Sequence, residues 1–264
     1  MSPVKAPPTD YLALAAAFEQ AGLARGFRSE RYGNVGGVPL LALTRKASGI
    51  KPRIYLSAGI HGDEPAPPLA LFNLLTEGFF DDRATWFLCP IMNPAGLARG
   101  TRENPAGVDL NRDFKALVSP EIRAHVAWLR QQPNFDLTIC LHEDWESTGF
   151  YLYELNPTGR PTLADRMIAA AAAIMPIDHS PLIDGRESVA GILRPPDDPA
   201  LRELWPEAIY LRANHTTLSY TVETPSTFPL EQRVRAQEAI VRAAVTAPSF
   251  VRCRMTAGQG PAAP

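Results

Sequence analysis

Short apolar runs alternate with segments of helical periodicity along most of this chain, and this alternation constrains the fold more than any other feature. The strand-like runs cover residues 38–43, 53–58, 85–88, 137–141, 149–155 and 217–222, and the helical segments cover residues 11–23, 69–75, 119–129, 163–174 and 228–245. Most runs are apolar on both faces, as in strands that helices cover on both sides. We therefore predict an α/β fold, a three-layer α/β/α sandwich around a mixed, mainly parallel central sheet.

No break in composition divides the chain into two parts. We expect residues 1–253 to form a single catalytic domain, and residues 254–264, which are rich in Gly, Ala and Pro, to form a disordered tail. Residues 92–117 carry turn-forming and polar residues without a clear period, which predicts a long loop. Long ordered loops in compact domains are often functional.

Charge and cysteine content restrict the classes of partner. The formal net charge is −2 and the pI is near 6.2, so no basic excess favours nucleic acid or an anionic membrane surface. No apolar run reaches the 18 residues of a membrane span. The cysteines, Cys89, Cys140 and Cys253, lack metal-site spacing, and two lie in apolar runs. Free buried thiols indicate a reducing compartment, so we expect a cytoplasmic protein.

Four polar residues stand at or just after the ends of strand-like runs. His61 and Glu64 follow the run 53–58, His142 closes the run 137–141, and Glu223 follows the run 217–222. Because ligands bind beyond the carboxyl ends of strands in such sheets, these side chains should meet at one edge. An H-x-x-E pair alone often arises by chance, but two histidines and one carboxylate match the ligand set of catalytic zinc. Zinc held in this way activates water at neutral pH.

Four motifs in order give a more specific indication. HGDE at 61–64, GVDLNRDF at 107–114, His142 after a strand, and Thr221-Val222-Glu223 together resemble the zinc carboxypeptidase superfamily of the carboxypeptidase A type. The short spacing between Glu64 and His142 resembles compact bacterial members, such as murein peptide amidases, and the succinylglutamate desuccinylase/aspartoacylase branch. Both branches carry the D-L-N-R element, so this element leaves the substrate open.

The resemblance implies a single zinc ion per chain, held by His61, Glu64 and His142. It also implies that Asp109 accepts a hydrogen bond from the nitrogen of His61 that does not bind metal. Such a carboxylate fixes the imidazole tautomer and raises its basicity.

The resemblance also implies roles for the substrate-facing residues. Asn111 and Arg112 would bind the substrate's carboxylate, for which a planar guanidinium suits a two-point contact. Arg102 would stabilise the oxyanion, and Glu223 would move a proton from water to the leaving nitrogen.

The superfamily's mobile tyrosine has no clear match in the sequence. Tyr210 is our candidate, with Tyr151 and Tyr153 as alternatives. Glu143, directly after His142, is expected to be solvated or to support the metal ligands, and His125 is expected at the surface between arginines of its helix.

These features predict a zinc-dependent hydrolase, a metallocarboxypeptidase or peptide amidase, that cleaves an amide bond next to a substrate carboxylate. Its substrate would be a small peptide. The first alternative is an N-acyl amino acid deacylase of the succinylglutamate desuccinylase/aspartoacylase type. A second is a non-catalytic metal- or peptide-binding protein on the same scaffold, although such a protein has no use for the proton transfer assigned to Glu223. The sequence does not indicate the oligomeric state.

Overall fold

A single mixed sheet of ten strands runs through the residues described by this computed structural model, 11–196 and 198–246. The strands are β1 (Arg28–Val35), β2 (Val38–Arg45), β3 (Arg53–Ser57), β4 (Thr85–Cys89), β5 (Leu137–Asp144), β6 (Tyr151–Leu155), β7 (Leu182–Ile183), β8 (Arg186–Val189), β9 (Ile192–Leu193) and β10 (Ser219–Pro225). Their order in the sheet is β1-β2-β4-β3-β5-β10-β6-β9-β8-β7. The predicted tail, residues 254–264, lies outside the described residues.

Parallel pairing is concentrated in the centre of the sheet. Strands β4, β3, β5 and β10 pair in parallel, whereas β1, β2 and β4 pair antiparallel at one end. At the other end β6 is antiparallel to β10, β9 is parallel to β6, and β7, β8 and β9 form an antiparallel group. The prediction of a mixed sheet with a mostly parallel centre is therefore confirmed.

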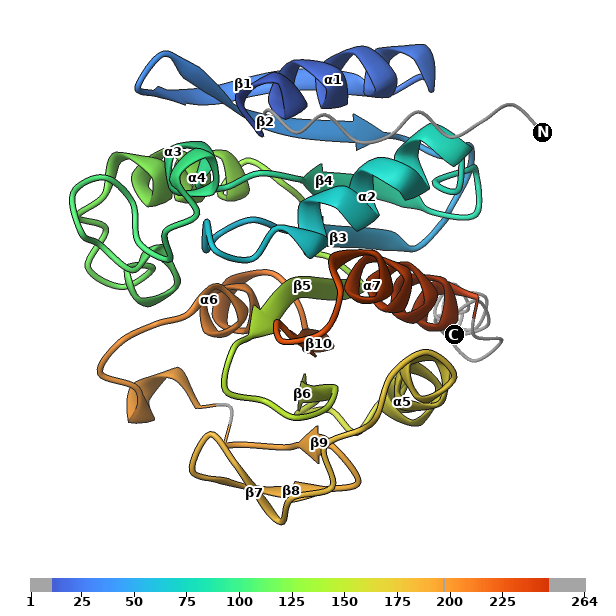
Figure 1. The fold of residues 1–264 in the computed structure, drawn as a ribbon. Coiled ribbons are helices and arrows are strands. Elements are labelled where there is room, and N and C mark those ends of the chain that lie inside the picture. The colour runs from blue at the N-terminus through green and yellow to red at the C-terminus, as the bar shows by residue number, and fades with distance from the viewer. Residues whose placement is uncertain (1–10, 197, 247–264) are drawn as a thin grey trace, which may run out of the picture.

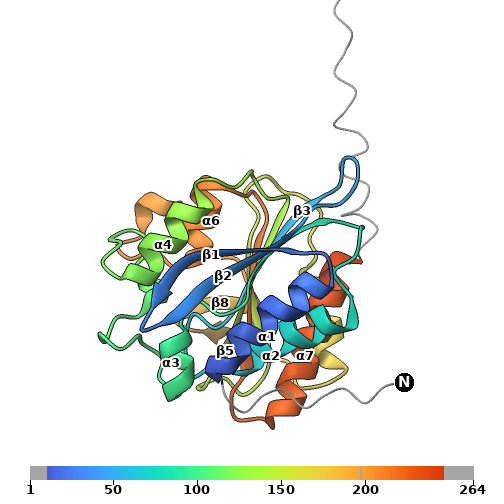
Figure 2. The same cartoon turned by 90° about the horizontal axis from the view of Figure 1, so that it is seen from above.

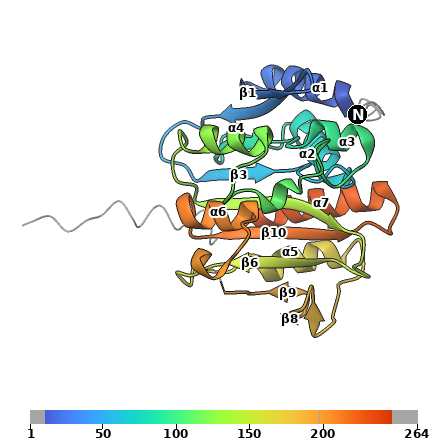
Figure 3. The same cartoon turned by 90° about the vertical axis from the view of Figure 1, so that its left-hand side faces the viewer.

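Helices cover both faces of this sheet. The helices are α1 (Tyr11–Ala24), α2 (Ala66–Glu77), α3 (Pro94–Arg99), α4 (Pro120–Leu129), α5 (Ala164–Ala172), α6 (Glu207–Asn214) and α7 (Leu230–Val245), with 3-10 turns at Leu110–Arg112 and Pro199–Leu201. Helices α1, α2, α5 and α7 pack on one face, and α4 and α6 pack on the other (Figures 1 and 2). The predicted three-layer α/β/α architecture is confirmed, and Figure 3 shows α4 and α6 in front of the central strands. Within the described ranges, no helix is long and apolar enough to cross a bilayer.

The two-residue period of the strands decides which side chains face the α4 and α6 layer. In β5, Ile139 and Leu141 pack under the α2 and α7 layer, whereas Cys140 faces the opposite layer. His142 therefore lies on the same face as Cys140. The parallel register pairs His142 with Glu223 of β10, so both side chains project from one face at one edge of the sheet.

Several elements differ from the sequence-based expectation. Strands β5 and β10 run to Asp144 and Pro225, so His142 and Glu223 lie inside strands rather than after them. The loop 92–117 contains α3 and a 3-10 turn, and β1, β7–β9 and α6 were not expected. These elements have polar or very short patterns, which sequence periodicity does not distinguish from loops.

Candidate metal centre and active site

The loop after β3 brings His61 and Glu64 to the carboxyl edge of the sheet, and two glycines shape it. Gly59 adopts a φ of +64°, which glycine tolerates without strain. Gly62 is needed for space, because a Cβ there would lie 1.9 Å from the carbonyl carbon of Gly96 in α3. The backbone amide of Gly62 also donates to the carbonyl of Thr101 at 3.0 Å. The loop is thus fixed against α3.

His61, Glu64 and His142 meet in a buried cluster. Nδ1 of His61 lies 2.5 Å from Oε1 of Glu64, and Nδ1 of His142 lies 3.0 Å from Oε2 of the same carboxylate. One donor atom from each of the three residues lies within 4.8 Å of the other two. Each residue is at most 3% exposed. The structure therefore brings together the three residues expected to bind metal.

Electrostatics in this cluster pair one buried carboxylate with two imidazoles, each of which stabilises the charged form of the other. Burial alone would lower the pKa of His61, but the carboxylates of Glu64 and Asp109 raise it to about 9. Burial would likewise raise the pKa of Glu64, yet His61 and His142 lower it to about 2. Two imidazole nitrogens and a carboxylate oxygen are the donor set of catalytic zinc sites with an open fourth position. The donor chemistry fits a divalent metal.

Asp109 holds the outer side of His61. Its Oδ1 lies 3.1 Å from Nε2 of His61 and accepts the backbone amide of Asn111 at 2.9 Å. Its Oδ2 accepts from Nε of Arg102 at 3.2 Å. Burial opposes ionisation, but the contact with His61 and the nearby arginines lower the pKa of Asp109. An ionised Asp109 fixes His61 with Nδ1 toward Glu64, as expected from the sequence.

Arg102 lies at the rim of the cluster. Besides its bond to Asp109, its Nη1 lies 3.6 Å from Oε1 of Glu64. About a third of its side chain is exposed, and it lines the main cavity. Its guanidinium can therefore reach both the cluster and a ligand in the cavity.

Asn111 and Arg112 line the same cavity from the 3-10 turn Leu110–Arg112. Nη1 of Arg112 donates to the carbonyl of Asn111 at 2.9 Å, and within the described ranges Arg112 makes no salt bridge. Oδ1 of Asn111 accepts the backbone amide of Glu207 at 2.9 Å. A guanidinium without a protein carboxylate is available to an anionic ligand.

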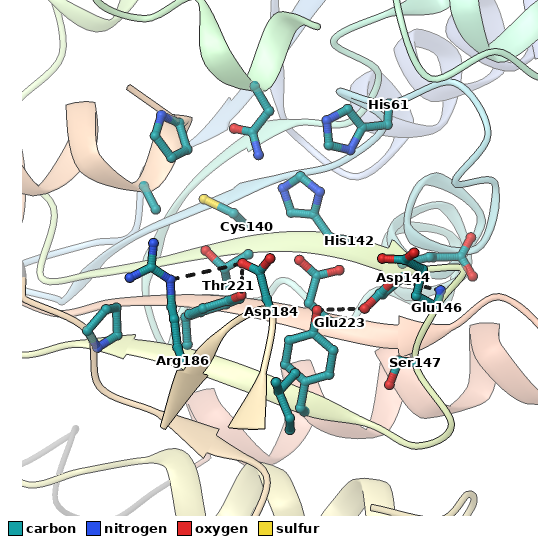
Figure 4. Close-up of a pocket in the computed structure, with 18 of the residues that line it drawn as sticks. His61, Cys140, His142, Asp144, Glu146, Ser147, Asp184, Arg186, Thr221 and Glu223 are labelled. Carbon is teal, nitrogen blue, oxygen red and sulfur yellow. Dashed lines mark hydrogen bonds and ion pairs between the residues drawn. The ribbon is translucent and has the colours of Figure 1, made fainter. Parts of the chain in front are cut away.

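The cavity that these residues share has a volume of about 650 Å³. Glu223 is half-buried on its floor, between its register partners His142 on β5 and Tyr151 on β6. Burial raises the pKa of Glu223 to about 8. Figure 4 shows Glu223 beside His142, below His61. Glu223 therefore lies beside the His61, Glu64 and His142 cluster and faces the same cavity.

The remaining wall of the cavity comes from β5–β6, from residues 178–186, from Pro195 and from residues 202–204. The hydroxyl of Tyr151 donates to Oδ2 of Asp144, and that of Tyr153 donates to Oδ2 of Asp184, both at 2.8 Å. Arg186 lies 4.0 Å from Asp184, and Figure 4 shows this pair across the view from Asp144 and Glu146. The sequence assigned no role to Arg186, because this segment has no strong pattern.

The candidate role of Tyr210 is wrong. Its side chain is 6% exposed and packs in the core between Phe114 and His215, with ring centroids 5.7 and 5.9 Å away. Helix α6 instead presents Pro206, Ala208 and Ile209 to the cavity. One helical step is about 100°, so the residue after Ile209 points into the core. The alternatives Tyr151 and Tyr153 do line the cavity.

A buried polar network lies behind Asn111, and the sequence did not predict it. The carboxylate of Glu207 accepts from the hydroxyls of Tyr55 and Ser57, both at 2.6 Å, and lies 3.5 Å from Nε2 of His125. His125 is 1% exposed, so the expectation that it lies at the surface is wrong. Two hydroxyls in the apolar run 53–58 were the available signal, because buried hydroxyls need partners.

Glu143 does not join the metal cluster of His61, Glu64 and His142. It supports the metal loop, the loop after β3 that carries His61 and Glu64. It is 4% exposed, pairs with Nη1 of Arg233 at 2.5 Å, and accepts the backbone amide of Ala66 at 2.8 Å. Burial raises its pKa to about 7, against the opposing effect of Arg233. Glu143 thus anchors the start of α2, next to Glu64.

Comparison with known proteins agrees with this geometry. The model of the succinylglutamate desuccinylase/aspartoacylase catalytic domain matches residues 50–190, which is more than half of the 264 residues. The chain belongs to this family. The matched segment contains the metal cluster and the Asn111–Arg112 pair, whereas Glu223 lies beyond it. No curated protein matches the chain.

The structure of this chain is also similar to solved structures of metallopeptidase-like proteins. A candidate metallopeptidase from Shewanella amazonensis SB2B has a TM-score of 0.78 and 25% identity, covering 90% of this chain and 92% of its own. A metallo-carboxypeptidase from Burkholderia cenocepacia has a TM-score of 0.66 and 20% identity, with coverages of 87% and 66%. Carboxypeptidase A from Helicoverpa armigera has a TM-score of 0.62 and 16% identity, with coverages of 89% and 72%. This member of the family is therefore a hydrolase with a carboxypeptidase-like fold.

Proposed function

We propose that the protein is a zinc-dependent hydrolase, a metallocarboxypeptidase or peptide amidase, that cleaves an amide bond next to a substrate carboxylate. One observation carries the proposal. The His61, Glu64 and His142 cluster, the half-buried Glu223 and the cationic residues of the 102–112 segment all face one cavity. The combination matches what hydrolysis of an amide with a nearby carboxylate requires.

His61, Glu64 and His142 would hold one zinc ion per chain. When bound, the zinc supplies a Lewis acid at the edge of the cavity. Asp109 would keep Nδ1 of His61 directed to the metal by holding the opposite nitrogen at 3.1 Å. Zinc is favoured over harder cations because imidazole nitrogens supply two of the three donors.

Glu223 would transfer the proton in this reaction. It would accept a proton from the attacking water and deliver it to the leaving nitrogen, so that an amine rather than an amide anion departs. Arg102 would stabilise the negative charge that develops on the carbonyl oxygen. A protein that only binds metal or peptide has no need of this pair, so the arrangement supports a catalyst over a binding protein.

Arg112 and Asn111 would bind the substrate's carboxylate. The guanidinium of Arg112 has no carboxylate partner within the described ranges, and the amide of Asn111 lies beside it on the same turn. Together they offer several N–H donors to two carboxylate oxygens, which is the geometry that favours arginine over lysine. The cleaved bond would therefore lie next to a free carboxylate.

An N-acyl amino acid deacylase is the second candidate, and the family match favours it. A deacylase and a carboxypeptidase share the same chemistry on the amide, and both products include a free amino acid carboxylate. They differ in the group on the acyl side. The fold match to the Shewanella metallopeptidase favours the peptidase.

A matched substrate panel tests these proposals. For one C-terminal amino acid, the zinc-loaded protein would be assayed with a tripeptide, an N-acetyl derivative and an N-succinyl derivative, each with a free and an amidated carboxylate. Glu223→Gln serves as the blank for contaminating hydrolases. Preferential turnover of the free-carboxylate peptide supports the peptidase, whereas preference for the N-acyl compounds replaces it with the deacylase. No turnover of any compound would contradict both.

The partners and compartment belong to the same proposal. We propose a small peptide or N-acyl amino acid as the only ligand besides zinc, with no nucleic acid or membrane partner. Cys89 and Cys140 are free and buried, which supports a reducing compartment such as the cytoplasm.

A further inference from the structure

Glu207 is a fully buried carboxylate that the proposed chemistry does not use. It is the first residue of α6 and is 1% exposed. Two hydroxyl donors on β3, Tyr55 and Ser57, each lie 2.6 Å from one of its oxygens. His125 of α4 lies 3.5 Å from the same carboxylate. The carboxylate therefore joins α6 to the central sheet and to α4.

The backbone of Glu207 meets the substrate side of the cavity. Its amide donates to Oδ1 of Asn111 at 2.9 Å, and Asn111 is 8% exposed. Since Oδ1 is occupied by this donor, the Nδ2 end of the amide is left for the cavity. Rotation of the amide by 180° would place two donors against each other and leave a buried donor unsatisfied. The bond to Glu207 thus fixes which end of Asn111 faces a ligand.

We propose that Glu207 is a positioning residue that locks Asn111 in the orientation that offers only N–H donors to the substrate. This inference rests on the proposed binding of a substrate carboxylate by Asn111 and Arg112. A subsite that offers only donors accepts a carboxylate and discriminates against a carboxamide, whose NH₂ group would meet another donor. Glu207 thereby contributes to specificity without touching the substrate.

The side chain of Glu207 is what keeps its backbone amide in place. Pro206 precedes it, so the start of α6 has no side-chain cap of its own. The bonds to Tyr55 and Ser57 tie this helix start to β3, the strand that continues into the loop carrying His61 and Glu64. Strand β3 consequently holds both the loop of His61 and Glu64 and, through Glu207, the carboxylate-binding turn Leu110–Arg112.

The chain supplies a matched control for this network. Glu154 is also a buried carboxylate, 3% exposed, and accepts from the hydroxyl of the buried Tyr220 at 2.7 Å. It also accepts from Thr162 at 2.6 Å and from Arg194 at 2.7 Å. None of these partners contacts Asn111. Glu154→Ala and Tyr220→Phe therefore reproduce the loss of buried hydrogen bonds without affecting the carboxylate-binding turn.

The experiment compares Glu207→Ala and Tyr55→Phe with Glu154→Ala and Tyr220→Phe on the full chain loaded with zinc. KM and kcat are measured with the free-carboxylate and amidated forms of the best substrate. We expect Glu207→Ala to raise KM for the free carboxylate by about tenfold with a much smaller change in kcat, and to reduce the preference over the amidated form. Glu207→Gln, which keeps the shape and can still bond both hydroxyls, should restore most of the loss. The control variants should lower Tm while keeping the wild-type preference.

The outcomes separate the inference from the proposed function. If the wild type itself does not prefer the free carboxylate, the proposed recognition fails. If the wild type has the preference and Glu207→Ala keeps it while losing only Tm, the positioning role is overturned. If Glu207→Ala does not fold, Tyr55→Phe provides the test, because it removes only the hydrogen bond from Tyr55 to Glu207. The quantity compared is again the ratio of kcat/KM for the free-carboxylate substrate to that for the amidated one. The side-chain amide resonances of Asn111, assigned by their loss in Asn111→Asp, should shift in Tyr55→Phe and stay unchanged in Tyr220→Phe.

Discussion

The backbone amide of Glu207 and the side-chain oxygen of Asn111 form a hydrogen bond of 2.9 Å between residues 96 positions apart in the chain. This bond crosses from the start of α6 to the 3-10 turn Leu110–Arg112. The orientation of a ligand-facing amide is therefore set by the backbone of Glu207, whose own side chain does not line the cavity.

Asn111→Asp tests that orientation directly. The new carboxylate can still accept the amide of Glu207, but it loses the donor toward the cavity and places a negative charge beside the substrate carboxylate. We expect KM to rise by roughly tenfold or more with metal content unchanged. Asn34→Asp, at an exposed turn where the side chain accepts from Gly37, is the control. Equal KM values for the two variants would contradict the assignment.

Metal removal should abolish activity and lower stability together. Dialysis against a chelator should remove close to one zinc per chain, and adding zinc back should raise Tm. At a free zinc concentration of 100 times Kd, the free energy of unfolding should rise by about 2.7 kcal/mol. His61→Ala should lose both the metal and the activity, since one of three donors is gone. His179→Ala, at an exposed histidine outside the cluster, is the control. Full activity in the metal-free protein would contradict the zinc proposal.

Glu223→Gln should separate catalysis from metal binding. The amide keeps the shape of the side chain but cannot accept the proton, so kcat should fall by roughly 100-fold or more. Zinc content and KM should change little, because Glu223 is not part of the donor cluster. Glu146→Gln changes an exposed glutamate on the cavity wall and serves as the control. Near-normal turnover in Glu223→Gln would mean that another group transfers the proton.

The candidate metal ligands could be predicted from the sequence because they follow apolar runs and stand in motifs that together resemble a known superfamily. The carboxyl ends of β3 and β5 bring together His61, Glu64 and His142. The two-residue period of β5 and the parallel pairing of β3 with β5 determine where these side chains meet. Tyr210 could not be placed, since one position along α6 decides between cavity and core. Its neighbour Ile209 faces the cavity whereas Tyr210 packs against Phe114.

The network around Glu207 was beyond the sequence for a different reason. Tyr55, Ser57, His125 and Glu207 come from three elements, and their contacts depend on how α4 and α6 pack on the sheet. The hydroxyls in β3 indicate that some partner is needed, but not which one. Long-range pairing of polar side chains carries no local period, and so periodicity cannot reveal it.

Arg112→Lys should report on recognition of the substrate carboxylate. Lysine keeps the charge but loses the planar pair of donors, so kcat/KM should fall by one to two orders of magnitude, about 1.4–3 kcal/mol. Amidating the substrate should cost the wild type a similar factor and the variant much less, because both changes remove one contact. Additive losses in this double cycle would show that Arg112 acts structurally.

The ionisation of Glu207 should stabilise the fold in a pH-dependent way. Burial alone would raise its pKa, but the bonds from His125, Ser57 and Tyr55 lower it below the ordinary 4.5. Because the folded-state pKa is depressed, this stabilisation is complete above about pH 4.5 and is lost as pH falls through the folded-state value. The side chains that contact the carboxylate or interact with it electrostatically are Tyr32, Tyr55, Ser57, Cys89, His125 and Cys140.

Thermal unfolding of wild type and Glu207→Gln across this pH range measures the effect. The difference in Tm should be largest near neutral pH and should shrink as pH falls from about 4.5, where the unfolded-state carboxylate takes up a proton, through the lower folded-state pKa. A Tm difference that stays constant with pH would mean that folding leaves the pKa of Glu207 unchanged, which contradicts the lowered folded-state pKa.

The register between β5 and β10 limits how such an enzyme can diversify. His142 and Glu223 are paired across two central strands, and a slip of one residue would turn either side chain to the opposite face of the sheet. The wall formed by residues 178–186 and 202–204, by contrast, comes from short strands and turns beyond the central strands, and such connecting segments tolerate insertions and substitutions better than a sheet centre does. Descendants of this fold can therefore acquire new substrates through that wall while the reaction itself stays fixed.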